Sequence, residues 1–263
     1  MLTLNALGRE LFAQVSRSVF PILGSTDRGK FFVVGTCILT IDQNEKAYLI
    51  TAAHVLETWG KRPLYISLDK KTLELSFRAL KSKPATPGSD DSLDIAIFPI
   101  PSQEASSFIG YDALPLYKPL GVNDKGSIFM FSYGYPSSQS DVDILRKGVV
   151  LKPLQYFGRE ITDFKIFTKL KYDITLHVLM KYLKRKSKII GVKNYVIAPK
   201  PKGVSGGPIF RCYRNVKSNE WIFVFCGVLT EFSYESAQVM KATKIEAIYP
   251  MLKIVSDSPC LFS

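Results

Sequence analysis

The chain has 263 residues, of which 46% are hydrophobic and 12% aromatic, and a formal net charge of +12. This composition is ample for a packed core and excludes a disordered chain, while the length predicts one large domain or two packed subdomains. No uncharged apolar stretch approaches the roughly 20 residues that a membrane-spanning helix needs, so we expect no transmembrane segment.

Residues 1–17 are expected to form a short amphipathic lead-in helix, because Leu4, Leu7, Leu11 and Val15 recur at helical spacing. The segment has no basic start, no continuous apolar stretch and no small-residue cleavage site, so it does not fit a secretory signal. We expect the helix to pack against the rest of the chain, and a partner-binding helix is the alternative.

The cysteines are scattered along the chain, at Cys37, Cys212, Cys226 and Cys260. They form no CxxC pair and no Cys/His cluster, so we expect neither a disulfide framework nor a metal site. Together with the missing signal sequence, this pattern predicts a reducing, cytoplasmic compartment.

Short runs of β-branched and aromatic residues, separated by turn-forming or charged stretches, predict two sets of six strands. The first set is 18–24, 30–41, 46–56, 63–69, 73–80 and 94–100. The second set is 127–136, 144–157, 194–201, 208–214, 221–232 and 238–248. Two sets of short strands predict an all-β fold of two six-stranded antiparallel barrels, not alternating strands and helices. We place the N-terminal barrel at 18–112 and the C-terminal barrel at 113–256, with a closing helix that starts at Pro250.

Residues 158–193 interrupt the second set and are expected to be a basic helical insertion. Leu176, Leu179 and Leu183 lie at helical spacing after Asp173, and basic residues follow at the far end. A segment 164–193 holds nine of the 35 basic residues, which could attract nucleic acid, an anionic membrane or an acidic partner. No recognised nucleic-acid module accompanies the charge, so nucleic-acid binding is the less favoured interpretation.

Three short motifs carry residue types that suit nucleophilic catalysis. LITAAH ends an apolar strand in His54, LDIAIF places Asp94 at the edge of a strand, and GVSGGP holds Ser205 among glycines. Each motif alone is typical of a turn or a strand end. Together they supply a base, an orienting carboxylate and a hydroxyl, the groups that activate a serine for attack on a carbonyl carbon.

In this order and on this strand pattern, the motifs resemble the trypsin- and chymotrypsin-like serine peptidases over roughly residues 18–256. The sequence is most similar to compact intracellular bacterial trypsin-like domains, which also carry a Gly-Tyr-Pro like that at 134–136. The resemblance implies a cytoplasmic bacterial endopeptidase that cleaves protein or peptide substrates through an acyl-enzyme intermediate, without metal or cofactor. By the same resemblance, His54 is the base, Asp94 the orienting acid and Ser205 the nucleophile.

The resemblance also assigns the backbone N–H groups of Gly203 and Ser205 to an oxyanion hole. The substrate-binding residues that it implies are Pro199, Leu229, Thr230, Glu231 and Phe232. No acidic residue falls at the base of the implied pocket, which favours a small or apolar side chain before the scissile bond. A carboxylate from Glu231 or Glu235 turned inward would reverse this preference.

Several alternatives stay open at this point. Asp90 and Asp91 compete with Asp94 for the orienting role, and His177 is expected to be a satisfied, partly buried histidine. Val204 stands where secreted zymogens place the aspartate that pairs with a newly cut N-terminal amine. Activation of that kind is therefore not expected, and the site forms on folding, or a partner or the insertion completes it.

The alternative function is a catalytically silent peptidase-fold module. Its groove or its basic insertion would dock a protein or nucleic acid. Proteolysis regulated by a protein partner is a further variant of the first hypothesis.

Overall fold

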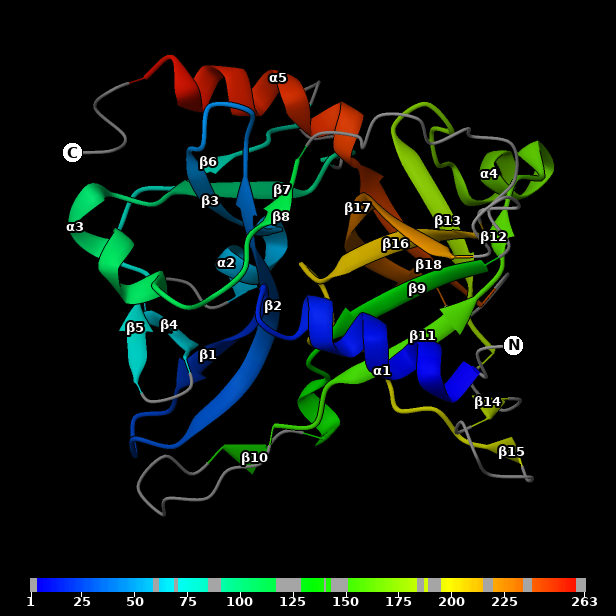
Figure 1. Cartoon of the computed structure of the whole chain (residues 1–263), viewed down its shortest axis with the longest axis horizontal. Helices are drawn as coiled ribbons and strands as arrows, with labels where there is room; N and C mark the ends of the chain where they lie inside the picture. The colour runs from blue at the N-terminus through cyan, green and yellow to red at the C-terminus, as the bar shows by residue number, and fades with distance from the viewer. Residues whose placement is uncertain are drawn as a thin grey trace.

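The computed structural model describes residues 4–58, 62–68, 71–84, 91–116, 129–139, 141–142, 151–183, 187–188, 195–214, 220–233 and 238–258. Two curled sheets lie side by side, one on each side of the molecule as drawn in Figure 1. None of the helices in the described residues has the length and apolar character that a membrane crossing requires.

The first sheet has the strand order β5-β4-β1-β2-β3-β7-β6. Its strands are β1 (Val19–Ser25), β2 (Phe31–Ile41), β3 (Ala47–Ala52), β4 (Leu64–Ser67), β5 (Thr72–Glu74), β6 (Leu80–Lys81) and β7 (Ile95–Pro99). Two short strands, β8 (Leu114–Pro115) and β10 (Asp141–Val142), pair with β2, and the β2–β8 pair is parallel. Both strands lie beyond residue 112, so the first sheet includes residues that are predicted to belong to the second barrel.

The second sheet has the strand order β11-β9-β16-β17-β18-β13-β12. Its strands are β9 (Phe129–Gly134), β11 (Leu154–Gly158), β12 (Glu160–Ile161), β13 (His177–Lys181), β16 (Pro208–Arg214), β17 (Trp221–Ser233) and β18 (Val239–Lys244). Two further strands, β14 (Ser187–Lys188) and β15 (Tyr195–Val196), pair only with each other among the described residues.

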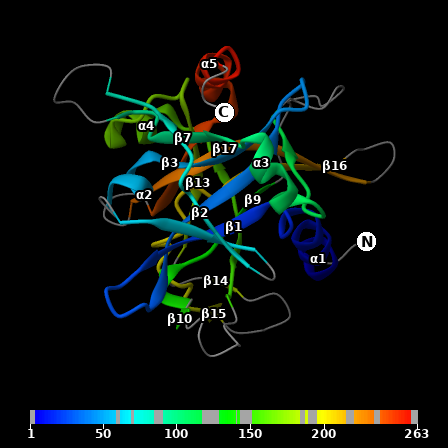
Figure 2. The same ribbon diagram turned by 90° about the vertical axis from the view of Figure 1, so that its left-hand side faces the viewer.

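The helices are short and lie at the edges of the sheets. They are α1 (Leu4–Val15), α2 (Ala53–Thr58), α3 (Ser102–Ala105), α4 (Phe164–Leu170) and α5 (Ile245–Ser256), with 3-10 turns η1 (Ser106–Phe108) and η2 (Ser137–Gln139). Helix α5 lies at the top of the molecule in both views (Figures 1 and 2). Helix α1 crosses the front of the molecule in Figure 1 and lies at its right-hand edge in Figure 2.

The two halves share one apolar core. The largest cluster of buried residues contains Ile50 of β3 and Phe131 of β9, together with Leu11 of α1 and Ile248 of α5. A second cluster fills the first half and a third fills the second half. Because both sheets and both terminal helices contribute to one cluster, residues at the junction of the halves are held in fixed positions.

The all-β prediction with a C-terminal helix is confirmed, but the sheets curl into half-barrels instead of closing. The expected strand 73–80 yields only the three-residue β5 and the two-residue β6, which pair with β4 and β7 and not with each other. The alternation of apolar and polar residues in this run does correspond to alternating burial, since Leu75 and Phe77 pack on the core of the first half and their neighbours are exposed. The alternation orients side chains there without a continuous hydrogen-bonded ladder.

The predicted helix after Asp173 is wrong in position. The insertion contains a helix, α4, but it lies earlier, and the run expected to be helical is the strand β13. Val178 and Met180 face the core of the second half, while Leu179 faces a small cluster under α4. The sequence of a strand that is buried on both faces is a continuous apolar run. The spacing of its apolar residues therefore does not distinguish it from a buried helix.

The closing helix also begins earlier than predicted, at Ile245, so that Pro250 lies inside α5 and not in its first turn. Ile245, Ile248 and Val255 are buried at helical spacing, and this apolar face fixes the helix on the shared core.

Candidate active site

His54 and Asp94 meet because the strands that carry them are neighbours. β3 and β7 pair antiparallel up to Ala52 and Ile95, so the residues just beyond them lie at one edge of the sheet. The His54 Nδ1 atom lies 2.6 Å from Asp94 Oδ2, and the main-chain N–H of His54 donates to Asp94 Oδ1 at 2.8 Å. The main-chain N–H of Ala53 donates to the carbonyl oxygen of Asp94 at 3.0 Å.

The contact with Asp94 fixes the tautomer and the orientation of the His54 imidazole, as a general base requires. With Nδ1–H donated to the carboxylate, Nε2 carries the lone pair that can accept a proton. The His54 side chain is 43% exposed and that of Asp94 is 18% exposed, so the base reaches solvent while its partner is largely covered. Asp94 has a φ of +50°, a left-handed conformation that costs a non-glycine residue about 1–2 kcal/mol.

The competing acids have other positions. The Asp91 carboxylate accepts from the main-chain N–H of Leu93 at 3.1 Å and contacts the Ser82 hydroxyl. Asp90 lies outside the described residues. Asp94 is therefore the acid that the fold brings to His54.

Ser205 lies in a tight turn between Pro201 and β16. The main-chain N–H of Val204 donates to Pro201 at 2.9 Å, and Gly203 inside this turn has a φ of +93°. Gly206, with a φ of +90°, lies so close to the first half that an added Cβ would sit 1.9 Å from the carbonyl oxygen of Thr36. Glycine is thus required there, because any side chain would separate the turn from β2.

The serine turn is docked on β2, next to the strand β3 that leads to His54. The main-chain N–H of Thr36 donates to the carbonyl oxygen of Ser205 at 2.8 Å, and the Thr51 hydroxyl donates to the carbonyl oxygen of Thr36 at 2.7 Å. Thr51 precedes His54 by three residues. All three predicted catalytic residues therefore lie at the junction of the two halves.

The two predicted oxyanion-hole amides are held by their neighbours. The carbonyl oxygen of Lys202, in the peptide that carries the Gly203 N–H, accepts from the main-chain N–H of Ser137 at 2.7 Å. The carbonyl oxygen of Val204, in the peptide that carries the Ser205 N–H, accepts from the main-chain N–H of Gly207 at 2.9 Å. The peptide between these two is held by the Thr36 hydroxyl, which donates to the carbonyl oxygen of Gly203 at 2.8 Å. The C=O and N–H of a trans peptide point in opposite directions, so anchoring Lys202 turns the Gly203 N–H away from Ser137. Within the described residues, neither the Gly203 nor the Ser205 N–H donates a hydrogen bond.

Sequence reasoning missed Thr36. Its hydroxyl donates to Gly203 and accepts from the main-chain N–H of Tyr135 at 3.0 Å, and the residue is fully buried. The Gly-Tyr-Pro motif at 134–136 also has a structural role, since Tyr135 bonds to Thr36 and the next residue, Ser137, bonds to Lys202 of the serine turn. No pattern in the sequence distinguishes Thr36 from an ordinary strand threonine.

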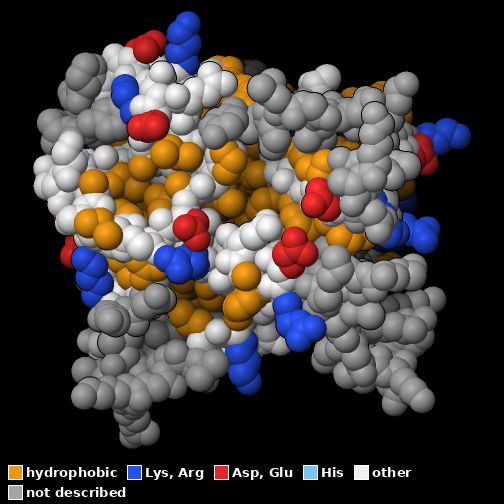
Figure 3. All heavy atoms as spheres, viewed as in Figure 1, with side chains coloured by type: hydrophobic (Ala, Val, Ile, Leu, Met, Phe, Trp, Pro, Cys, Tyr) orange, Lys and Arg blue, Asp and Glu red, His pale blue; other side chains and the backbone are white. Residues whose placement is uncertain are grey.

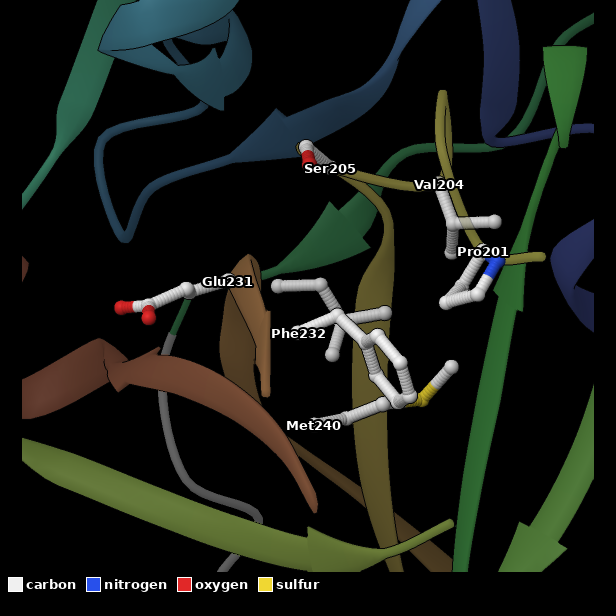
Figure 4. Close-up of a pocket in the computed structure, with 7 residues that line it drawn as sticks. Pro201, Val204, Ser205, Glu231, Phe232 and Met240 are labelled. Atoms are coloured by element: carbon white, nitrogen blue, oxygen red, sulfur yellow. The ribbon is translucent and has the colours of Figure 1, made fainter. Parts of the chain in front are cut away.

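A shallow hollow lies beside Ser205 (Figure 4). Its other lining residues are Pro201, Val204, Leu229, Glu231, Phe232 and Met240. The predicted Leu229, Glu231 and Phe232 are among them, whereas Pro201, Val204 and Met240 were not expected.

The remaining two predicted substrate residues do not line the hollow. The carbonyl oxygen of Pro199 accepts from the Tyr182 hydroxyl at 2.5 Å. Thr230 is 2% exposed, and its hydroxyl has no hydrogen-bond partner among the described residues. Thr230 is therefore buried in the second half, whereas Pro199 is partly exposed and is held by Tyr182.

The carboxylate of Glu231 points away from the hollow (Figure 4). Its oxygens bind the Tyr172 hydroxyl at 2.8 Å and the Lys241 ammonium at 2.9 Å. Burial alone would raise the pKa of Glu231, but the hydrogen bond and charge of Lys241 outweigh it and hold the pKa below its ordinary value. The hollow itself is therefore lined mainly by apolar side chains.

Two other expectations concern metals and charge. No group of three or more His, Cys, Asp or Glu side chains that could hold a metal occurs among the described residues. On the face drawn in Figure 3, the Lys and Arg side chains of the described residues are scattered and form no single patch. Much of the basic run at the end of the insertion, 184–186 and 189–194, lies outside the described residues.

No protein-family model matches the sequence, and no curated protein matches it. Solved structures do match. The structure of GrC has a TM-score of 0.54 at 12% identity and covers 92% of this chain and 95% of its own. A thermostable serine protease, AL20, from an extremophilic microorganism has a TM-score of 0.54 at 14% identity, with 92% of this chain and 98% of its own covered. At these identities the similarity establishes the fold alone, and the chain has the chymotrypsin-like fold of two half-barrels.

Proposed function

We propose that the protein is a serine endopeptidase that cleaves protein or peptide substrates through an acyl-enzyme intermediate. The observation that carries the proposal is the 2.6 Å contact of His54 Nδ1 with Asp94, at the edge where the Ser205 turn is docked. A protein that only binds a partner has no physical need for all three groups.

The chemistry follows from these positions. The Ser205 Oγ atom attacks the carbonyl carbon of the scissile peptide while His54 Nε2 takes the hydroxyl proton. The C–N bond breaks, and the imidazolium gives that proton to the departing amine. Water then attacks the acyl-enzyme ester, His54 again takes and returns a proton, and Ser205 is restored.

The negative charge on the substrate oxygen needs donors that are already in place. The N–H groups of Gly203 and Ser205 are free of hydrogen bonds within the described residues, which supports their assignment to the oxyanion hole. Such a donor is typically worth about 10²–10³ in rate. The main-chain N–H groups of Ser137 and Gly207 fix the two peptides that carry these donors, and the Thr36 hydroxyl fixes the peptide between them.

The hollow supports a preference for small or apolar side chains before the scissile bond. Phe232 and Met240 occupy its floor and wall, leaving little depth, and Val204 adds a further apolar surface. The Glu231 carboxylate is engaged by Tyr172 and Lys241 and is not available to a basic side chain.

No N-terminal cleavage is needed in this proposal. Val204 is 2% exposed and lies in the apolar core of the second half, where an ion pair with a new amine has no counterpart. The serine turn is instead held by Thr36 and Ser137, so folding alone forms the site.

A peptide-library cleavage profile tests the proposal. We expect the full-length protein to cut after small or apolar residues, and Ser205→Ala and His54→Ala to abolish cleavage. Folded wild-type protein that cuts no peptide, or cleavage that survives in Ser205→Ala, would refute the peptidase assignment.

A further inference from the structure

One buried ionisable side chain has no part in the chemistry above. His177, on the insertion strand β13, is 3% exposed. Its Nε2 atom lies 2.7 Å from the carbonyl oxygen of Ser92, which belongs to the other half of the molecule. Ser92 precedes Asp94 by two residues, so the histidine contacts the segment that carries the orienting acid.

Hydrogen bonds define the state of this imidazole. The main-chain N–H of Asp173 points at Nδ1 from 3.2 Å, so Nδ1 must be an unprotonated acceptor. The ring proton is then on Nε2, which donates it to Ser92. The Tyr172 ring packs beside the imidazole with the two centroids 5.9 Å apart. His177 is thus a neutral donor with a single tautomer, held on both sides.

A second side chain holds the next carbonyl of the same segment. Thr243 on β18 lies directly opposite His177 in the β13–β18 pair. Its hydroxyl donates to the carbonyl oxygen of Leu93 at 2.6 Å, and the residue is fully buried. Two cross-strand neighbours of the second half therefore hold two consecutive carbonyls of the first half.

The segment that they hold is under backbone strain. Asp94 follows directly with its left-handed φ of +50°, a conformation that persists only where the surroundings enforce it. From its own half, Asp91 holds the main-chain N–H of Leu93. From the other half, His177 and Thr243 hold the carbonyls, so that the backbone leading into Asp94 is fixed from both sides.

We propose that His177 is a positioning residue for the active site, through which the insertion strand β13 keeps Asp94 in its place on His54. This inference rests on the proposed peptidase function. It assigns the insertion a role within the catalytic unit, because without the imidazole the strained Asp94 segment loses its main cross-barrel anchor beside Thr243.

The test compares His177→Phe, which removes the donor, with His177→Gln, whose amide N–H can reach the Ser92 carbonyl. We expect His177→Phe to lower kcat by about 3- to 10-fold with KM unchanged, the effect of one lost hydrogen bond on the catalytic geometry. His177→Gln should recover at least half of the wild-type kcat. Wild-type kcat in folded His177→Phe, or an equal loss in both variants, would overturn the proposal.

A second pair of variants distinguishes a change in the catalytic geometry from a general loss of stability. Thr243→Val removes the hydroxyl from Leu93, and Thr40→Val removes a similarly buried hydroxyl that donates to Tyr48 at 3.2 Å, away from the site. Both should destabilise the fold to a similar degree, but only Thr243→Val should lower kcat. If Thr40→Val lowers kcat as much, the effect is one of general stability and the proposal fails.

A spectroscopic readout separates this inference from the proposed function. The chain has only two histidines, so the low-field NMR signal of the His54 Nδ1 proton can be assigned by exclusion. We expect this signal to shift or broaden in His177→Phe and to return in His177→Gln, whether or not a substrate is cut. An unchanged signal in His177→Phe would overturn the positioning role, whereas wild-type protein without peptidase activity would overturn only the proposed function.

Discussion

Thr36, at the junction of the two halves, forms hydrogen bonds that hold the serine turn. The Thr36 hydroxyl bonds to Gly203 and Tyr135 at once, and Thr36 has no exposure to water that could replace either partner. A buried polar group that loses its partner costs more free energy than a typical hydrogen bond contributes. Thr36 therefore links the stability of the molecule to the geometry of the serine turn.

Replacing Thr36 by valine keeps its shape and removes the hydroxyl. We expect Thr36→Val to lower the free energy of unfolding by about 1–3 kcal/mol, because the Gly203 carbonyl and the Tyr135 N–H are left unpaired. The rate of peptide cleavage should fall by about tenfold or more, since the peptide between Gly203 and Val204, which connects the two peptides that present the oxyanion donors, is loosened. Urea unfolding and steady-state kinetics measure the two effects.

Thr36→Ser is the matched control, because serine keeps the hydroxyl. It should retain most of the cleavage rate. Equal kinetics for Thr36→Val and the wild type would show that the serine turn does not depend on this hydroxyl.

The contact of His54 with Asp94 could be predicted at this scale, and the side chains that support the candidate site could not. His54, Asp94 and Ser205 belong to residue types with few chemical roles, and their order along the chain narrows those roles further. Thr36 is a common strand residue whose hydrogen-bond partner Gly203 is 167 positions away in sequence. Only the fold brings such partners together.

At the scale of elements, the insertion strand β13 links the hollow beside Ser205 to the Asp94 segment. His177 bonds to Ser92, its neighbour Tyr172 bonds to Glu231, and Glu231 lines the hollow beside Ser205. The charged groups around the imidazole are the Lys241 ammonium and the carboxylates of Asp173 and Glu231. Burial lowers the pKa of His177, and the charge of Lys241 lowers it further.

This lowered pKa predicts how stability depends on pH. Below about pH 6.5 the unfolded chain binds a proton at His177 that the folded chain excludes, so the free energy of unfolding falls as pH falls. His177→Gln has no such group. We therefore expect the stability advantage of the wild type over His177→Gln to be larger at about pH 7.5 than at about pH 5.5.

Urea unfolding of both proteins at the two pH values measures this difference. The carboxylates near the ring titrate at lower pH and are shared by both proteins, so they largely cancel. An advantage that is constant with pH would show that the folded protein does not exclude the proton.

Elements with clear alternation or turn signals could be predicted, and β13 could not. Val178, Leu179 and Met180 are all buried, on two different faces, so the sequence contains no polar position that reveals a period of two. The choice between strand and helix is made by β18, which pairs with this segment from His177 to Lys181. Information of that kind is not local in the sequence.

At the scale of the whole molecule, two half-barrels share one core and meet where glycine permits the closest approach. A Cβ on Gly206 would lie 1.9 Å from the Thr36 carbonyl oxygen and 2.3 Å from the Thr51 hydroxyl. Neither group can move without disturbing β2 or β3. Two successive antiparallel β-sheets could be predicted from the runs of strand-forming residues, but this contact depends on how the sheets curl toward each other.

Gly206→Ala tests the importance of this contact for the whole fold. We expect a loss of about 4 kcal/mol or more in the free energy of unfolding, because the added methyl group forces the halves apart. Gly29 offers a control with a φ of +72° and no atom within 4 Å of an added Cβ. Gly29→Ala should cost only the backbone strain, about 1–2 kcal/mol. Equal losses in the two variants, measured by urea unfolding, would contradict the close approach.

The central claim is that the fold makes Ser205 a nucleophile activated by His54 and Asp94. Labelling with a serine-reactive fluorophosphonate, followed by intact-mass and peptide analysis, tests it most directly. We expect the full-length, unprocessed protein to gain one adduct at Ser205, Ser205→Ala to gain none, and His54→Ala to react far more slowly. Equal labelling of the wild type and Ser205→Ala, or no labelling of folded wild-type protein, would contradict the claim.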